Sequence, residues 1–306
     1  MFQRTKDWLL RREPPVGSYP KIPLDMNVKI TVIIPTYNNW RTLLPCLESI
    51  FKQTLQPFET VVVDNGSTDE TSFELKRFLP SVKVVKLTRN EGVTGGRNAG
   101  IKVASKKTKY LFFFDHDMVA GKKMLERLVS VAEKSGAGIV TPKIYYLGDR
   151  KRIWSAGTGI NLWTGQVLFR GGEDNGQYDK VEEVQVAPAA MLVKKEVIKK
   201  IKGFDNKYFA TFEDTDFCFR AKTSGFKTFY APDAVAWHDL STDRKDEVNR
   251  LLDRAYWVGR NRVLFMRDFG KNLFVFLVFL YFFTIYYIYL SLKQHRPRDG
   301  IRFIEG

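Results

Sequence analysis

The sequence has few residues that form disulfides or bind soft metals: its 306 residues include two cysteines and three histidines. Cys46 and Cys218 lie far apart and lack the spacing of a metal site, which argues against a disulfide framework and favours a reducing compartment. Residues 1–12 hold no uninterrupted apolar core of signal-peptide length, so we expect no export signal there. The sequence also contains no internal repeat and no low-complexity tract.

The composition indicates a folded protein with an anionic partner. Hydrophobic residues make up 44% of the chain and aromatic residues 14%, which argues against disorder. The net charge of +15 fits nucleic acid, an acidic membrane surface or a phosphorylated substrate. Because the basic residues are spread along the chain and cluster most near a C-terminal apolar segment, we expect no nucleic-acid partner and favour phosphate-bearing lipids or a lipid-linked acceptor.

The first half of the chain predicts an α/β fold with a mostly parallel sheet flanked by helices. Short apolar runs alternate with segments of helical periodicity, and this alternation is typical of βαβ units. Ligands of such sheets bind beyond the carboxyl ends of the strands, where polar residues follow each run. The predicted strands cover residues 29–34, 60–63, 82–87 and 110–114, and the predicted helices cover residues 41–54, 71–78 and 98–104.

The second half has a looser pattern. Residues 136–186 carry many glycines between aromatic residues, which predicts hairpins and loops. After them we expect a strand at residues 189–193, a helix at 195–201, a helix at 217–222 and a strand at 227–230. The loosely patterned region controls loop geometry, so the sequence does not name a substrate.

Residues 273–292 form an uncharged apolar stretch that is long enough for a helix to cross a bilayer. Basic residues stand on both sides of it, so the positive-inside rule gives no orientation. A spanning helix and a helix lying in the membrane interface both stay open. A buried core helix is the third alternative, but several tyrosines crowd this segment and it lies beyond the main domain. We therefore expect a membrane-associated helix.

Asp115-His116-Asp117 is the sharpest chemical signal, because it directly follows the apolar run that ends at Phe114. Two carboxylates at a strand end can bind a hard divalent cation and, through it, phosphate oxygens. A lone Asp-X-Asp is more often a solvated turn. Its place at the end of a buried strand in a βαβ series favours the metal site.

Two further segments point to nucleotide binding. Asp64 ends the second strand, where a carboxylate can accept hydrogen bonds from a base or ribose, although residues 64–69 also read as a turn into a capped helix. The glycines between Gly92 and Arg97 follow the third strand rather than the first, which argues against a dinucleotide fold. They still allow Arg97 to approach a nucleotide; the alternative is a tight turn with Arg97 on the surface.

Glu213 and Asp214 follow a hydrophobic loop that could keep a carboxylate partly dry, which suits Asp214 as a general base. The alternative is charge at a helix N-terminus, which accounts for Asp216 and fits Glu213. His238 follows an apolar run and, taken alone, reads as a structural histidine.

Taken together, these motifs resemble those of family-2 glycosyltransferases with the GT-A fold. The resemblance covers residues 29–240, and it is specific through the order and spacing of its motifs rather than through any one of them. Within that family, residues 90–98 together with Trp237 and His238 are similar to the rhamnosyl- and galactofuranosyltransferase branch. The motifs are residues 31–38, 63–69, 97–100, 115–117 and 213–216.

The resemblance implies a role for each site residue. The base pocket would be lined by Pro35, Thr36 and Tyr37, with Asp64 on the nucleobase, Arg97 supporting the nucleotide and Asp115 on the ribose or the metal. The metal, Mn²⁺ or Mg²⁺, would be bound by Asp117, with His238 as a further ligand. Asp214 matches the catalytic base, and Glu213 would position the acceptor. His116 inside the metal motif and Ala189-Ala190, where many relatives carry a glycine-containing pair, depart from the family pattern.

The resemblance also implies domains and a reaction. A GT-A catalytic domain would cover residues 29–240, preceded by an extension at 1–28 and followed by a basic helical linker at 241–272, the membrane-associated helix at 273–292 and a basic tail at 293–306. The reaction would be inverting transfer from a nucleotide-diphosphate sugar to a hydroxyl of a glycan or lipid-linked acceptor, at the cytoplasmic side of the cell membrane. The alternatives are a membrane-tethered nucleotide-sugar binder and a nucleotidyltransferase. The oligomeric state is not readable.

Overall fold

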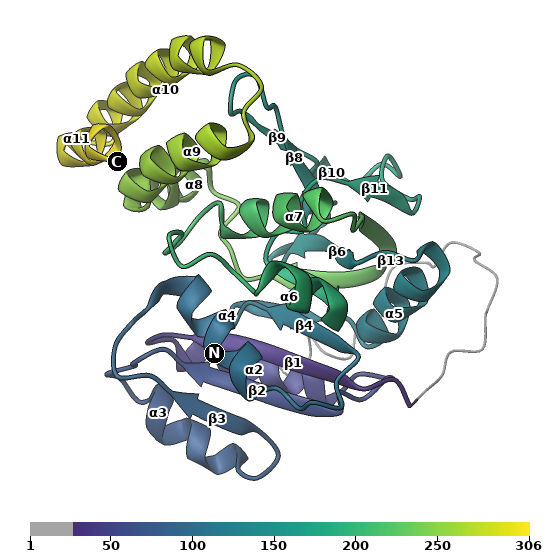
Figure 1. The fold of residues 1–306 in the computed structure, drawn as a ribbon. Helices are drawn as coiled ribbons and strands as arrows, with labels where there is room; N and C mark the ends of the chain where they lie inside the picture. Colours follow the sequence, from purple (N-terminus) through teal and green to yellow (C-terminus); the bar gives the residue numbers. More distant parts are fainter. Residues whose placement is uncertain (1–26) are drawn as a thin grey trace.

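The structure is a computed structural model that describes residues 27–306, so most of the predicted extension 1–28 lies outside the described residues. It is a mixed sheet with helices on both faces and a group of helices at the C-terminal end (Figure 1). The first half of the chain forms β1 (Ile30–Thr36), α2 (Trp40–Phe51), β2 (Glu59–Asp64), α3 (Thr71–Glu74), η1 (Leu75–Phe78), β3 (Lys83–Lys86), α4 (Gly92–Val103), β4 (Tyr110–Phe114), β5 (Met118–Ala120) and α5 (Met124–Ser135).

The second half begins with strands and ends with helices. Its strands are β6 (Ile139–Tyr146), β7 (Asp149–Ser155), β8 (Thr158–Ile160), β9 (Val167–Phe169), β10 (Gly172–Glu173), β11 (Glu182–Val184), β12 (Ala190–Lys194) and β13 (Thr228–His238). Its helices are α6 (Lys195–Ile201), α7 (Glu213–Thr223), α8 (Arg244–Asp253), α9 (Ala255–Phe269), α10 (Leu273–Lys293) and α11 (Pro297–Glu305).

The predicted α/β sheet is confirmed, and its pairing is mixed. Strands β4, β1, β2 and β3 lie side by side and parallel, as their βαβ connections require. Beyond β4 the direction changes, because β12 pairs antiparallel with both β4 and β6. The long strand β13 then runs parallel to β6, with a register shift between Ala231 and Val235.

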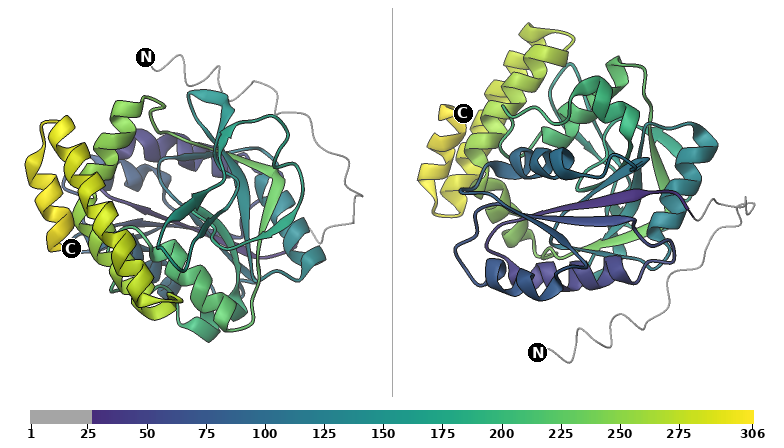
Figure 2. Two further views of the ribbon diagram at one scale, coloured as in Figure 1. Left: turned by 90° about the horizontal axis from the view of Figure 1, so that it is seen from above. Right: turned by 60° about the horizontal axis from the view of Figure 1, so that its bottom comes forward.

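The two faces of the sheet bury separate cores. Alternate residues of β1 face opposite sides: Val32 packs in the core that α2 and α5 cover, while Ile33 packs in the core that α4, α6 and α7 cover. Phe265 of α9 and Phe276 of α10 join this second core. Residues 241–272 therefore form two helices, of which α9 packs on the α/β sheet domain, and Figure 2 shows α9 lying against it.

The predicted apolar helix is present as α10. Its mean hydropathy is 2.3 over an 18-residue window, of which 17% is buried, so it is long and apolar enough to cross a membrane. Length and composition alone do not distinguish a span from a helix that rests on a membrane.

Candidate active site

The ends of three neighbouring parallel strands define the site. In the register of the sheet, Thr36 at the end of β1 lies beside Asp64 at the end of β2, and β4 ends next to them before Asp115. The Thr36 side chain is buried, and its hydroxyl has no hydrogen-bond partner among residues 27–306. Tyr37, the next residue, is 41% exposed. The residues predicted for the base pocket thus stand at the edge where a ligand of an α/β sheet binds.

Helix α4 approaches this edge very closely. A Cβ added to Gly96 would lie 2.9 Å from Cβ of Pro35, so only glycine fits there without a shift. The glycines that the sequence indicated as a turn instead form the first turns of α4, because the helix must pack against the end of β1.

Asp64 is buried and holds the turn that follows β2. Its Oδ1 accepts a hydrogen bond of 2.8 Å from the backbone N–H of Ser67, and its Oδ2 accepts one from the hydroxyl of Ser72. Both oxygens therefore have partners within the turn, which matches the turn interpretation of this segment. A contact with a nucleobase stays a prediction.

Arg97 lies at the centre of the site with a fully enclosed side chain. Its Nη2 donates to Oδ1 of Asp115 over 2.9 Å, its Nη1 donates to Oδ1 of Asp214, and its guanidinium lies 5.0 Å from the centre of the Phe204 ring. Oε1 of Glu213 lies 4.0 Å from the same Nη1. One buried cation thus joins carboxylates from α7 and from the end of β4. It has no exposed surface with which to contact a nucleotide directly.

Glu213 and Asp214 occupy the first turn of α7, rather than the loop before it. Burial raises the pKa of Glu213 to about 7, and the charge of Asp214 adds to this effect. Oε2 of Glu213 is buried without a partner in the described chain. Burial also raises the pKa of Asp214, while Arg97 opposes the shift. The two carboxyl groups therefore share a buried site in which Glu213 holds a proton more readily than an exposed glutamate.

Three residues next to Asp214 have left-handed backbone conformations, and one of them, Ala189, hydrogen-bonds to its carboxylate. Ala189, at φ 61°, donates its N–H to Oδ2 of Asp214 over 3.0 Å. Thr211 and Phe212 also have left-handed φ values of 64° and 63°. Glycine adopts this conformation more readily than alanine, so Ala189 pays a backbone cost at the position where the family resemblance leads one to expect a glycine-containing pair.

Asp117 and His238 form a second centre beside the first. They come together because β5 and β13 pair antiparallel, and Oδ1 of Asp117 lies 3.2 Å from Nε2 of His238. Burial raises the pKa of Asp117, but the charge of His238, its hydrogen bond and His116 lower it more, so the net pKa lies below the usual range. His116 itself contacts the hydroxyl of Thr42 through Nδ1 at 3.0 Å.

These donors fit a divalent cation in part. The carboxylate suits Mn²⁺ or Mg²⁺, and Mg²⁺ usually keeps waters and substrate phosphates as its other ligands, whereas imidazole suits softer transition metals better. Asp115, the third predicted ligand, faces Arg97 instead, and residues 27–306 contain no group of three His, Cys, Asp or Glu side chains placed for a metal. Asp117 and His238 would therefore hold the ion as a pair.

Sequence reasoning missed Asp239. Its backbone N–H donates to the carbonyl of Asp117 over 2.8 Å, and burial together with the charge of Asp117 raises its pKa. The apolar residues before His238 could have indicated Asp239, because a strand predicted to continue beyond Tyr230 would have ended next to it.

Comparison with known proteins identifies the family of the chain. Residues 31–202 match the family described as glycosyl transferase family 2, which is more than half of the chain. The chain belongs to glycosyl transferase family 2. The poly(ribitol-phosphate) beta-N-acetylglucosaminyltransferase TarP of Staphylococcus aureus is 25% identical over 77% of this chain and 71% of its own length. The glycosyltransferase GlyG of Streptococcus pneumoniae is 26% identical over 60% of this chain and 62% of its own.

Solved structures support the fold of this family 2 chain. A TarS fragment of S. aureus, residues 1–349 in complex with UDP, has a TM-score of 0.53 and 21% identity, over 76% of this chain and 65% of that one. Longer S. aureus TarS has a TM-score of 0.54 at 21% identity, over 74% of this chain and 39% of its own. The chain thus spans well under half of that protein. An uncharacterized protein of Sinorhizobium fredii is 27% identical over 74% of this chain, and the match covers 26% of the length of that relative.

Proposed function

We propose that this chain is an inverting glycosyltransferase that transfers a sugar from a nucleotide-diphosphate donor to a hydroxyl of a glycan or lipid-linked acceptor. The observation that carries this proposal is the buried Arg97, which joins Asp115 at the end of β4 to Asp214 at the start of α7. A base candidate is thereby fixed beside the sheet edge at which α/β proteins bind nucleotides. Family membership supports the reaction class.

The proposed mechanism needs one displacement. Asp214 accepts the proton of the acceptor hydroxyl, whose oxygen attacks the anomeric carbon from the face opposite the diphosphate, and the configuration inverts. Arg97 and the N–H of Ala189 hold the carboxylate in one orientation. Glu213, at the same helix start, positions the acceptor.

A divalent ion, Mn²⁺ or Mg²⁺, bound between Asp117 and His238 would neutralise charge on the leaving diphosphate. Asp115 would contact the ribose, since its second oxygen is not engaged by Arg97. Thr36, with its unpartnered buried hydroxyl, is suited to a polar group of the base.

A UDP-sugar is the donor that the comparisons favour, because the TarS fragment of similar fold is in complex with UDP. The sugar itself stays open between the N-acetylglucosamine and glucose named for relatives and the rhamnose and galactofuranose of the branch that the motifs resemble. We propose that the protein lies at the cell membrane with its catalytic domain on the cytoplasmic side; the apolar helix α10 supports the membrane association.

The decisive experiment measures release of UDP from UDP-sugars by purified full-length protein, with Mn²⁺, Mg²⁺ or a chelator. We expect metal-dependent release, and we expect Asp214→Asn and Asp117→Ala to lower turnover by about 10²- to 10⁴-fold with the fold intact, as circular dichroism of the variants would show. Asp253→Asn is the matched control, because Asp253 lies on the surface of α8 and pairs only with Arg296 among the described residues.

Three results would contradict the proposal. Turnover near that of the unmodified protein in the Asp214→Asn variant excludes its role as the base. Binding of a UDP-sugar without release under any metal condition supports the nucleotide-sugar binder. Release of diphosphate from a nucleoside triphosphate in the presence of a sugar phosphate supports a nucleotidyltransferase.

A further inference from the structure

Helix α10 is attached to the protein along one face over its whole length. Residues spaced by three or four positions form this face, although α10 is apolar on its other sides as well. At one end Phe276 is buried in the core with Phe265. At the other end the Tyr287 ring stacks on Phe303 of α11 at 4.0 Å, and a Cβ on Gly300 would lie 2.6 Å from Oγ of Ser291. Figure 1 shows α8, α9, α10 and α11 gathered together.

The helices that cover this face are too polar to enter a bilayer. The buried guanidinium of Arg262 in α9 lies 4.1 Å from the centre of the Phe283 ring of α10, so the charge and the apolar helix are in direct contact. In α9, Arg260 and Asn261 also bond to backbone carbonyls of the loop before α7. If α10 crossed a bilayer, it would either take these groups into hydrocarbon or lose its covering helices, and charged groups there are strongly disfavoured.

The opposite face of α10 is a continuous apolar surface. Phe274 is 75% exposed, and large side chains follow it along the helix to Leu292. A helix of 21 residues is about 30 Å long, so this surface is large for a soluble protein. Ile301 and Ile304 extend it on α11. Its members on α10 are Leu273, Phe274, Leu277, Val278, Phe279, Tyr281, Phe282, Ile285, Tyr286, Tyr289 and Leu292.

Trp163 adds an interfacial anchor at the start of α10. It is 47% exposed in the turn between β8 and β9, and this turn is tied to α10 because the N–H of Lys271 donates to the carbonyl of Leu162 over 2.8 Å. Tryptophan and lysine are typical of the border between headgroups and acyl chains.

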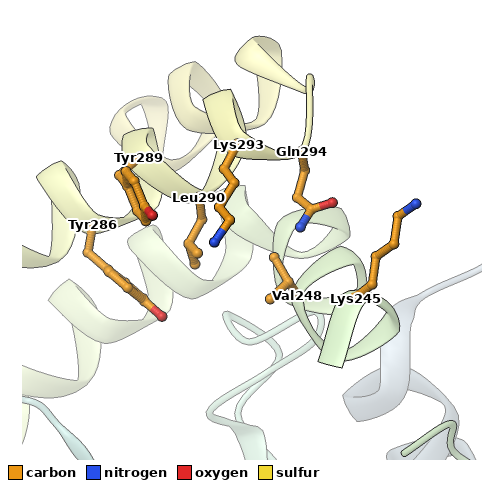
Figure 3. Close-up of a pocket in the computed structure, with 7 residues that line it drawn as sticks. All are labelled: Lys245, Val248, Tyr286, Tyr289, Leu290, Lys293 and Gln294. Atoms are coloured by element: carbon orange, nitrogen blue, oxygen red, sulfur yellow. The ribbon is translucent and has the colours of Figure 1, made fainter. Parts of the chain in front are cut away.

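Basic residues without ion-pair partners flank the apolar surface. Lys271 stands at one end, and Lys245, Lys293 and Arg298 stand at the other; none makes an ion pair within the part of the chain that is described. Lys245 and Lys293 also line a pocket of about 380 Å³ between α8 and α10, with the hydroxyl-bearing Tyr286 and Tyr289 and with Val248, Leu290 and Gln294 (Figure 3). Its cationic and aromatic lining fits the phosphate of an anionic phospholipid.

We propose that α10 lies flat in the headgroup region of an anionic bilayer, with its outward face in the acyl boundary and a lipid phosphate in the pocket between α8 and α10. This proposal refines the membrane association in the proposed function and rests on it. The exposed surface is one-sided because α9 and α11 cover the other face of α10, and cations stand at its two ends; these polar neighbours favour a helix in the membrane interface over a spanning one.

Depth measurements test the flat orientation. A fluorophore is attached to cysteine introduced in the variants Phe274→Cys, Phe282→Cys and Leu292→Cys, while the native Cys46 and Cys218 are buried. Full-length protein is bound to vesicles of phosphatidylcholine and phosphatidylglycerol that carry quenchers at a shallow or a deep position. We expect all three positions to report the same shallow depth. A deep Phe282 between shallow ends would mean that α10 crosses the bilayer and would overturn the proposal.

Vesicle binding tests the surface and the pocket. We expect at least tenfold weaker binding for Phe282→Ser, because an apolar ring is lost, and about 30-fold weaker binding for Lys245→Gln/Lys293→Gln at low salt, from about fivefold for each lysine. The matched control is Phe73→Ser on α3, whose ring is 62% exposed and belongs to another surface. Equal loss in this control, or no preference for anionic vesicles, would overturn the docking surface.

Two further measurements separate this proposal from its rivals. If a second copy of the chain covers the apolar face instead, the protein is a detergent-resistant dimer that does not bind vesicles, and the proposal fails. UDP release in detergent is measured on the same samples. Release without vesicle binding overturns the docking surface alone, whereas flat binding without release overturns the proposed enzymatic function alone.

Discussion

Arg97→Met tests whether one buried cation organises the candidate active site. Methionine keeps most of the side-chain volume but removes the charge that Asp115 and Asp214 face and the cation 4.0 Å from Glu213. Removing one partner of a buried ion pair costs about 3–5 kcal/mol, because the remaining charges stay buried and unpaired. For a domain of this size, each kcal/mol lowers the melting temperature by about 2 °C, so we expect a decrease of about 6–10 °C at pH 8.

The same reasoning predicts how this loss depends on pH. Without Arg97 the pKa of Asp214, already raised by burial, rises further above its unfolded value. The folded variant then binds more protons than the unfolded chain, so its deficit is small at low pH and grows as the pH increases through that folded pKa. We therefore expect a clearly smaller deficit at pH 5 than at pH 8.

Urea unfolding of both proteins at pH 5 and pH 8 checks this prediction. The control is Arg77→Met, because Arg77 is 67% exposed and pairs with Glu74 on the surface, where such a pair contributes less than about 1 kcal/mol. A deficit for Arg97→Met that is equal at the two pH values would refute the electrostatic explanation. A deficit as small as that of the control would refute the central role of Arg97.

Two further predictions concern single side chains near the site. The pKa of Glu213 is about 7 in the folded protein against an ordinary value of 4.5, so the free energy of unfolding should fall by up to about 3 kcal/mol as the pH rises between these values. Urea unfolding of Glu213→Gln should show no such fall. An unchanged pH dependence in this variant would exclude Glu213 as its source. Gly96→Ala should lower stability by about 1–3 kcal/mol in the same assay through its contact with Pro35, whereas Gly148→Ala, with open space around it, should change it by less than about 0.5 kcal/mol.

Buried strands of the first half were predictable because each is an apolar run that ends in a polar residue. The run at residues 110–114 is β4 itself, and β1 and β2 differ from their predicted ranges by one or two residues at each end. Helix α4 was predicted to begin near Asn98 but begins at Gly92. Glycine-rich sequence favours a turn locally, and only the tertiary requirement for close packing against β1 makes it helical.

The sequence indicated where the residues of the candidate site lie in the sheet, but it did not indicate which of their side chains contact one another. The order of the motifs indicated which strand ends carry Asp64, Asp115 and Asp117, since parallel strands end at a common edge. That Arg97 pairs with Asp115 and Asp214 depends on how α4 and α7 pack across the sheet, which no local pattern encodes. Strand β13 continues eight residues past the predicted end, because a bulge after Ala231 carries it around Pro232.

The hydrogen bonds of Asn261 make the C-terminal helices a structural support of the candidate active site. Its amide donates to the carbonyls of Ala210 and Thr211, immediately before α7, the helix that carries Asp214. Phe265, which lies on α9 with Asn261, is buried in the core that α7 covers. Shortening the chain after residue 240 to improve solubility would strip this support and uncover that core. An inactive truncated protein would then reveal nothing about whether turnover requires a lipid environment; that question has to be addressed with point substitutions on the outer face of an intact chain.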